Sequence, residues 1–305
     1  MQEIRVLSPA TVANVVCGFD CLGFALENPF DEMTVRRMGE KSIRIINRDD
    51  LGLPTDPAKN VAGVALMAML AEAKVDFGIE VEITKHIKPG SGIGSSAASS
   101  CGAVVAANRL MDDRFAKLEL AKFAMEGEKL ASGTRHADNV APCIFGGITM
   151  VRSIDPLDIV PLNFPTLFAT VIHPQIEIKT VDARAILPID VSLKTAIRQW
   201  GNLGSLVAGL AQNDYGLISR SMEDFIVEPV RKSLIPKFDE VKAASIAAGA
   251  LGGGISGSGP SMFMLSNTRE IADAVEVAMG YVYSETDIAF NTYTSQLNVS
   301  GVRFL

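Results

Sequence analysis

The chain has 305 residues, of which 48% are hydrophobic and 21% are charged, and its formal net charge is −7. This length predicts two domains, and the apolar fraction excludes a disordered or collagen-like chain. An acidic chain without a run of Lys or Arg is poorly suited to a nucleic-acid backbone or an anionic membrane, so we expect neither as a partner. We expect a small-molecule substrate instead.

The apolar stretches and the cysteines indicate a cytoplasmic protein. The longest apolar stretch, residues 61–71, is about half of the ~20 residues that a membrane span needs. The first residues lack the apolar core of a signal peptide. Cys17, Cys21, Cys101 and Cys143 contain no C-x-x-C pair, and the chain has three histidines, so we expect free thiols and no zinc site.

The first half of the chain alternates strands with helices. We predict strands at residues 4–7, 22–27, 34–38, 42–47, 77–87, 148–152 and 167–172, and helices at 60–71, 95–110 and 117–130. Within 77–87, apolar residues at odd positions alternate with Glu80, Glu82 and Thr84. One face of that strand should therefore be solvated.

The second half continues the mixture. We predict helices at residues 183–187, 193–211, 236–248 and 269–282, a strand at 261–266 and two closing strands. Strands and helices interleave without a regular βαβ period, which predicts an α+β fold. The stretch between Pro156 and Pro165 is rich in proline, as linkers often are. We therefore expect one domain over residues 1–160 and another over 161–305, with Pro188 as the alternative boundary.

A glycine-rich loop at residues 89–99 is the strongest signal in the sequence. A strand precedes it, Gly90, Gly92 and Gly94 let the backbone turn, and a helix begins at Ser95 and Ser96. Free N–H groups and the positive end of the helix dipole then face one point, which predicts an anion site. The two serine hydroxyls can either cap the helix or reach a phosphate and its Mg²⁺.

The same loop has three other interpretations. It can be a turn that serine caps without any ligand. A Walker A loop requires Gly-Lys, and no Gly-Lys occurs in the chain. The spacing of Gly92, Gly94 and Ala97 satisfies a relaxed dinucleotide fingerprint, but the preceding strand alternates and a helix follows where a second parallel strand is required. Phosphate binding remains the favoured interpretation.

Three more stretches carry polar or glycine-rich patterns. The second glycine cluster, residues 252–261, is either a flexible hairpin or a close approach of backbone to a ligand or to the first loop. Residues 126–139 combine acidic, cationic and amide groups, which suits a cation beside a substrate pocket or a solvated helix end. Asn14 and Asp20 lie in an apolar N-terminal stretch, so they need partners, either structural or substrate.

These four stretches, in this order, resemble the GHMP small-molecule kinases. The loop at 89–99 matches the phosphate motif of the family, with Ile93 where leucine is usual, and residues 255–261 match its C-terminal glycine motif. The members that act on L-homoserine share similar stretches at residues 56–62 and 136–142, at 180–184 with 187–188, and at 228–231 with 234–236. Val16 and Cys17 replace the Gly and the Pro or Ser often found before the Gly-Phe-Asp of the first motif.

The resemblance implies an activity, a fold and an assembly. The activity is ATP-dependent phosphorylation of the L-homoserine hydroxyl to O-phospho-L-homoserine, in threonine biosynthesis. The fold is a two-domain α+β kinase with an N-terminal domain like domain 2 of ribosomal protein S5 and a ferredoxin-like C-terminal domain, assembled as a homodimer. The alternatives are another GHMP alcohol kinase with a mevalonate-like substrate, a non-catalytic nucleotide-binding sensor and, third, a dehydrogenase.

The resemblance also assigns site residues by motif position. ATP would contact Asn60, Val61, Lys88, Pro89, Gly90, Ser91, Gly92, Ile93, Gly94, Ser95, Ser96 and Ala97, and Mg²⁺ would contact Ser96 and Glu128. The amino acid would contact Asn14, Asp20, His136, Asn139, Thr180, Arg184, Arg231 and Gly257. This allocation suits a zwitterion, because guanidinium groups bind a carboxylate and carboxylate or amide oxygens accept from an ammonium group.

The catalytic assignment comprises Ser96, Glu128, Asp138 and Asn139. Phosphoryl transfer mainly requires alignment of the nucleophile and neutralisation of charge. Asn139 stands where some relatives place an aspartate, and an amide cannot accept the hydroxyl proton at neutral pH. We therefore predict catalysis by positioning, with the phosphate as the eventual proton acceptor and Asp138 as the alternative base.

Overall fold

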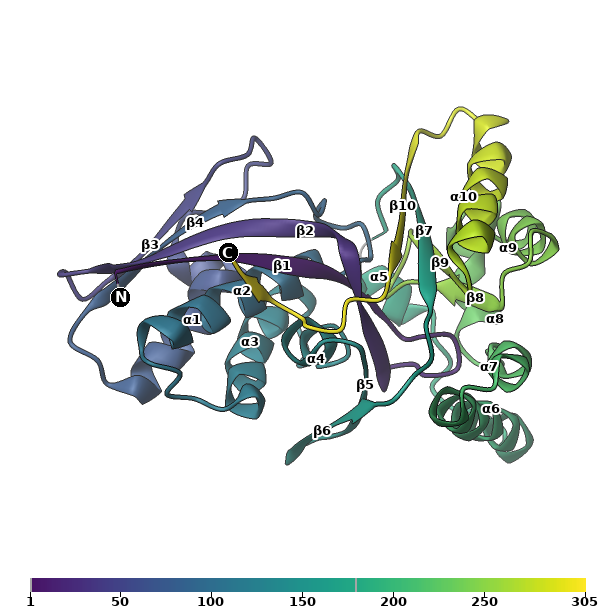
Figure 1. Cartoon of the computed structure of the whole chain (residues 1–305), viewed down its shortest axis with the longest axis horizontal. Coiled ribbons are helices and arrows are strands. Elements are labelled where there is room, and N and C mark those ends of the chain that lie inside the picture. Colours follow the sequence, from purple (N-terminus) through teal and green to yellow (C-terminus); the bar gives the residue numbers. More distant parts are fainter. Residues whose placement is uncertain (1, 179) are drawn as a thin grey trace.

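The computed structural model describes residues 2–178 and 180–305. These residues form two β-sheets with helices packed against each (Figure 1). The mixture of largely antiparallel sheets and unevenly spaced helices confirms the predicted α+β class. The chain passes from the first sheet to the second between residues 162 and 168, and its last strand returns to the first sheet.

The first sheet has seven strands. They are β1 (Glu3–Ala13), β2 (Leu22–Met38), β3 (Ile43–Asn47), β4 (Gly78–Thr84), β5 (Ile148–Ile154), β6 (Leu157–Leu162) and β11 (Arg303–Phe304). Their order is β11-β1-β2-β4-β3, β5 pairs with β2 and β6, and only the β3–β4 pair is parallel. Helices α1 (Val61–Ala73), α2 (Ser95–Leu110) and α3 (Lys117–Ser132) pack together on one face (Figure 1).

The alternation predicted for β4 is confirmed by burial. Ile79, Val81 and Ile83 are buried in the core beneath the helices. Glu80 and Glu82 lie on the opposite face, where Arg36 of β2 forms ion pairs with both. The solvated face is therefore covered by charged pairs and not by a second layer.

The second sheet has the strand order β10-β7-β9-β8, and every pair is antiparallel. Its strands are β7 (Phe168–Pro174), β8 (Gly252–Ile255), β9 (Met262–Ser266) and β10 (Phe290–Gln296). Helices α9 (Phe238–Ala247) and α10 (Arg269–Ser284) pack against each other and against this sheet. The remaining helices are α4 (Val140–Phe145), α5 (Thr180–Ala185), α6 (Leu193–Gln212), α7 (Tyr215–Ser221), α8 (Glu228–Arg231), and the 3₁₀ turns η1 (Pro57–Lys59) and η2 (Lys232–Leu234).

One apolar cluster joins the two sheets. Phe24 of β2 and Phe263 of β9 meet edge to face, with ring centroids 5.4 Å apart. Val12 of β1 and Ile93 of the glycine-rich loop are fully buried in the same cluster. The glycine-rich loop is thus anchored through Ile93 to a packed core, which fixes its position between the two sheets.

Two predicted elements differ from the structure. The strands predicted at 22–27 and 34–38 are one strand, β2, because β1 pairs with both parts and the ladder is irregular only across residues 26–29. Pro29 lies within this irregularity, where no ladder hydrogen bond needs its missing N–H. The proline-containing stretch after Pro156, where we expect a domain boundary, contains strand β6, which pairs with β5 as a hairpin.

Candidate active site

A cavity of ≈ 550 Å³ opens between the two sheets. Sixteen of the predicted site residues line it: Asn14, Asp20, Val61, Pro89, Gly90, Gly92, Gly94, Ser95, Ser96, Glu128, His136, Asp138, Asn139, Arg184, Arg231 and Gly257. These residues come from segments that are far apart in the chain, so the fold gathers the predicted phosphate, metal and amino-acid groups in one hollow.

The phosphate loop has the backbone geometry that its glycines predict. Gly90, Gly92 and Gly94 have φ values of 74°, 81° and 72°, in the left-handed region that favours glycine. Gly94 is the N-cap of α2 and no side chain caps the helix, so the interpretation as a serine-capped turn is wrong. The Ser95 hydroxyl donates instead to the carbonyl of Ile87, at 2.8 Å. The first-turn N–H groups of α2 stay available to an anion.

The second glycine cluster packs against this loop. The Ser256 hydroxyl donates to the Gly92 carbonyl at 2.8 Å, and the Ser261 hydroxyl donates to the Ser91 carbonyl at 2.6 Å. A Cβ at Gly92 would lie 2.6 Å from the carbonyl oxygen of Gly259, so a side chain there would separate the loops. The predicted close approach of the two loops is confirmed, and the cluster forms strand β8 and the connection of the β8–β9 hairpin.

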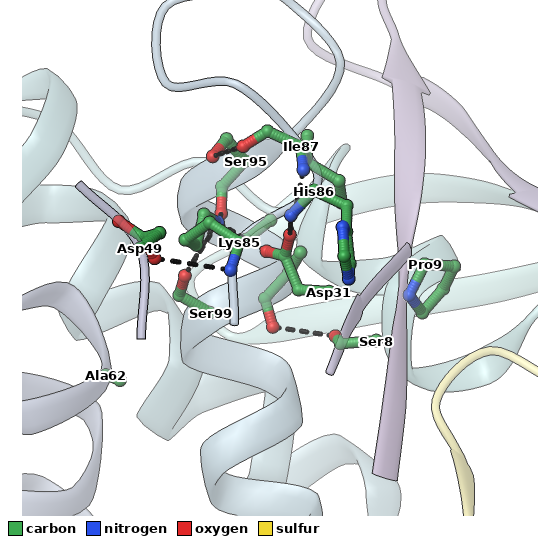
Figure 2. Close-up of polar contacts among 12 residues, drawn as sticks. Ser8, Pro9, Asp31, Asp49, Ala62, Lys85, His86, Ile87, Ser95 and Ser99 are labelled. Atoms are coloured by element: carbon green, nitrogen blue, oxygen red, sulfur yellow. Dashed lines mark hydrogen bonds and ion pairs between the residues drawn. The ribbon is translucent and has the colours of Figure 1, made fainter. Parts of the chain in front are cut away.

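A buried ion pair beneath the phosphate loop was not predicted (Figure 2). Lys85 follows β4, and its ammonium group pairs with the carboxylate of Asp31 and donates to Ser95 O at 2.8 Å and Ser99 Oγ at 3.0 Å. Asp31 Oδ1 also accepts from two backbone N–H groups, of residues 86 and 87. Because Lys85 lines the cavity, its positive charge adds to that of the helix N-terminus.

The sequence contained a signal for Lys85. The buried apolar side chains of β4, Ile79, Val81 and Ile83, occupy odd positions, and position 85 continues that parity. A lysine on the inward side of a strand requires a charged partner, because an unpaired buried ammonium group is strongly unfavourable. Asp31, more than fifty residues earlier in the chain, could not be identified as that partner from spacing.

Glu128 has the properties of a divalent-cation ligand. Its carboxylate is buried, and Oε1 has no hydrogen-bond partner among the described residues. Burial raises the pKa of Glu128 to about 7, against the lowering effects of a hydrogen bond from Ser96 and of the Lys85 charge. An uncompensated carboxylate oxygen next to a serine hydroxyl, beside an anion site, suits Mg²⁺, which takes its other ligands from phosphate and water.

A cation and an anion meet at the other end of the cavity. Arg184 Nη2 donates to both carboxylate oxygens of Asp20, at 2.9 and 3.0 Å. The Asp20 N–H donates to Asn14 Oδ1 at 2.9 Å, and Asn14 Nδ2 donates to the Gly257 carbonyl at 2.7 Å. Asn14, Val16 and Asp20 all have positive φ, so the replacement of Gly by Val16 leaves a turn that still brings Asp20 to the cavity.

Arg231 is the second guanidinium at this end. It is buried and donates through Nε to Ala183 O at 2.8 Å and through Nη1 to Gly257 O at 3.2 Å. Burial, together with the charge of Arg184, lowers its pKa. Phe19, which was not predicted, lies against both guanidinium groups, with its ring centroid 5.5 Å from Arg184 Cζ and 5.0 Å from Arg231 Cζ. The ring helps to hold two cations close together.

His136 and Asp138 are titratable groups of the cavity wall. His136 Nδ1 lies 3.7 Å from Asp20 Oδ1, and burial with nearby Arg184 and Arg231 lowers the His136 pKa against the effect of Asp20. Burial raises the pKa of Asp138 to about 7, and the Asp20 charge raises it further, against backbone hydrogen bonds. The Asp138 carboxyl is therefore partly protonated at neutral pH.

Five predicted ATP contacts do not line the cavity. Asn60 caps α1 through Oδ1, which accepts from the N–H groups of residues 62 and 63, and so positions Val61 at the cavity. Ser91, Ile93 and Ala97 belong to residues 89–99 but are fully buried. Lys88 points outward, where its ammonium donates to Gln175 Oε1 at 2.7 Å. The predicted role of Thr180 lies outside the side chains that the structure describes.

Comparisons with known proteins place this chain in one enzyme family. Residues 60–147 match the family profile of the GHMP kinases N terminal domain, and residues 206–285 match that of the GHMP kinases C terminal region. The chain is 44% identical over 308 residues to homoserine kinase of Chloroherpeton thalassium, which covers 95% of this chain and 97% of that protein. It is 43% identical over 320 residues to homoserine kinase of Chlorobium phaeovibrioides, with 100% of both chains covered.

Solved structures with similar folds include a homoserine kinase and a mevalonate kinase. The crystal structure of homoserine kinase from Cytophaga hutchinsonii superposes with a TM-score of 0.96 at 50% identity and covers 100% of this chain and 98% of that chain. Mevalonate kinase of L. major in complex with R-mevalonate has a TM-score of 0.72 at 17% identity, covering 96% of each chain, which is a likeness of fold. No helix in the described part of the chain is long and apolar enough to cross a membrane.

Proposed function

The chain belongs to the GHMP kinases, and we propose that it transfers the γ-phosphoryl group of ATP to the side-chain hydroxyl of L-homoserine, forming O-phospho-L-homoserine for threonine synthesis. The observation that carries this proposal is the cavity between the sheets. It joins an uncapped helix N-terminus, which suits phosphates, to an Asp20–Arg184 pair with Arg231, which suits an amino acid.

At the phosphate end, the chain supplies positive electrostatic potential without a Walker lysine. The first-turn amides of α2 donate to phosphate oxygens, and Lys85 adds charge from beneath the loop. Ser96 and Glu128 would hold Mg²⁺, which when bound neutralises charge on the phosphates. Val61, Leu53 and Ala131 line the same cavity and provide apolar surface for the nucleoside.

At the amino-acid end, the zwitterion would exchange partners with the protein. Asp20 and Arg184 neutralise each other in the free cavity. The substrate carboxylate would take guanidinium donors from Arg184 and Arg231, and its ammonium group would be accepted by Asp20 and Asn14. This exchange keeps Asp20 and Arg184 paired with opposite charges in both states, and it gives Arg231, which donates only to the Ala183 and Gly257 carbonyls in the free cavity, a carboxylate partner.

We propose that the transfer proceeds by alignment. Held between the two ends, the substrate hydroxyl faces the phosphoryl group, and the proton passes to the transferred phosphate. Asn139 has no basic atom, whereas Asp138, whose pKa burial raises to about 7, is a cavity carboxyl with the proton affinity of a general base. Asp138 remains the alternative base, and its test is given in the Discussion.

An ADP-release assay with a panel of alcohols tests the function. We expect turnover with L-homoserine to exceed that with mevalonate by orders of magnitude, because mevalonate lacks the ammonium group that Asp20 would accept. Preference for mevalonate would identify a different alcohol kinase. ATP binding with no ADP from any alcohol would identify a nucleotide-binding sensor, against which the arrangement of Ser96 and Glu128 argues.

We further propose that the enzyme is a cytoplasmic homodimer. The four cysteines are free, as in a reducing compartment. Helix α6 leaves Leu193, Ile197 and Trp200 exposed on one stripe, which a second copy would cover. Light scattering coupled to size exclusion tests the assembly. A dimer that Trp200→Glu separates into monomers supports it, and a monomeric wild type contradicts it.

A further inference from the structure

Thr11 is a buried residue that contacts both the phosphate loop and a cavity residue. It lies in β1 with no exposed surface. Its N–H donates to the Ile93 carbonyl of the loop at 3.1 Å, just after the register of β1 against β2 shifts. Its hydroxyl donates to Oδ1 of Asn139 at 2.7 Å. This single side chain therefore links the first strand to the start of α4, 128 positions later.

The bond from Thr11 decides which end of the Asn139 amide faces the cavity. An amide side chain has an acceptor oxygen and a donor NH₂ group at opposite corners. Since Oδ1 is engaged by the Thr11 hydroxyl, the NH₂ group is the end that Asn139 can offer to a ligand in the cavity that it lines. Asn139 makes no capping bond to α4, so its side chain is not held by its own helix.

Gly94 leaves the space that this contact occupies. A Cβ at position 94 would lie 2.0 Å from Thr11 Oγ1 and 2.9 Å from Asn139 Oδ1. The Thr11–Asn139 contact thus passes directly beside the N-cap of the phosphate-binding helix. The amide is held next to the point where the phosphoryl group would be transferred.

We propose that Thr11 is a positioning residue for phosphoryl transfer, which fixes the Asn139 amide with its N–H donors directed at the acceptor hydroxyl and the transferred phosphoryl oxygens. This role rests on the proposed function. It requires no proton transfer to Thr11 or Asn139, since the donors only stabilise charge that develops on oxygen. Without Thr11 the amide can rotate, and its oxygen would then face the phosphoryl oxygens and repel them.

Kinetics of Thr11→Val and Thr11→Ser test this role. Thr11→Val keeps the shape and removes the donor, so we expect kcat to fall about 10-fold, with both KM values changed less than about twofold. Thr11→Ser restores the hydroxyl and should recover most of kcat. Thr170→Val is the matched control, because Thr170 is equally buried and donates to Ala272 O at 3.0 Å, away from the cavity. It should lower stability without changing kcat.

A double-mutant cycle separates positioning from a structural role. If Thr11 acts through Asn139, Thr11→Val should cause no further loss of kcat in an Asn139→Ala background. An equal loss in both backgrounds, or an unchanged kcat in Thr11→Val, would overturn the proposal. Should Thr11→Val fail to fold, Thr11→Cys, with its weaker donor, takes its place in the same cycle.

Turnover of L-homoserine by the wild-type enzyme distinguishes a failure of this proposal from a failure of the proposed function. Turnover of L-homoserine by the wild type, together with an unaffected Thr11→Val enzyme, would refute the role of Thr11 alone. No turnover of L-homoserine by the wild type would overturn both, because the positioning role presupposes that reaction.

Discussion

Replacement of Glu128 by glutamine should remove part of the pH dependence of folding. Burial raises the pKa of Glu128 from 4.5 to about 7 in the folded, ligand-free protein. The unfolded chain therefore loses this proton first, and between these two pKa values the native state binds more protons. Stability must fall as pH rises across that window. At about 1.4 kcal/mol per unit, the loss due to Glu128 is about 3 kcal/mol.

Urea unfolding of the ligand-free wild type and Glu128→Gln at pH 5, 6, 7 and 8 measures this effect. The two proteins should have similar free energies of unfolding at pH 5, and the variant should be more stable at pH 8 by about 2–3 kcal/mol. Most of the Asp138 contribution cancels in the difference, because burial, the main cause of its raised pKa, is common to both proteins, and only the smaller effect of the Glu128 charge is lost in the variant. A variant that is less stable at pH 8, or a difference that does not change with pH, would refute the assignment of Glu128 as a destabilised buried carboxylate.

The same substitution should abolish most activity. Glutamine cannot supply the charge that a divalent cation requires, so kcat/KM for Mg·ATP should fall by at least about 100-fold. The combination of a more stable protein at pH 8 and an inactive one is what a metal-binding role predicts. A Glu128→Gln enzyme with wild-type kcat/KM would remove Glu128 from the metal site.

Three further predictions concern other parts of the cavity. Lys85→Met leaves Asp31 buried and unpaired, so urea unfolding should show a loss of about 3–5 kcal/mol, much of which Asp31→Asn should restore in the double variant; a loss below about 1 kcal/mol would contradict the pairing. Arg231→Ala should raise KM for L-homoserine about 10-fold or more and leave KM for ATP unchanged, and equal effects on both would place Arg231 outside the amino-acid site. Asp138→Asn should retain kcat within about 10-fold, and a fall of about 1000-fold with intact folding and KM would make Asp138 the base.

Local patterns in the sequence predicted the phosphate loop well. Three glycines at alternate positions determine their own backbone conformation, and their φ values depend on few distant contacts. The helix that starts at Ser95 and the alternating strand before the loop are also encoded within a few residues. Such features follow from steric preference and periodicity, which act over short distances along the chain.

Contacts between distant residues were beyond the reach of such patterns. Asp20 meets Arg184 across 164 positions, and Ser256 meets Gly92 across a similar separation. The motifs named three of these residues individually, but their pairing depends on how the two sheets pack. The Gly-Phe-Asp motif contains Phe19 but does not indicate its contact with two guanidinium groups, and Asp31 carries no local signal. Both roles exist only beside cations supplied by other segments.

A crystal structure with Mg²⁺, a non-hydrolysable ATP analogue and L-homoserine tests the central claim most directly. The account predicts that the phosphates lie on the first-turn amides of α2, with the metal on Ser96 and Glu128. It also predicts the substrate carboxylate at Arg184 and Arg231, with the hydroxyl facing the terminal phosphate. A nucleotide bound in another cavity, or an amino acid bound away from both arginines, would contradict it.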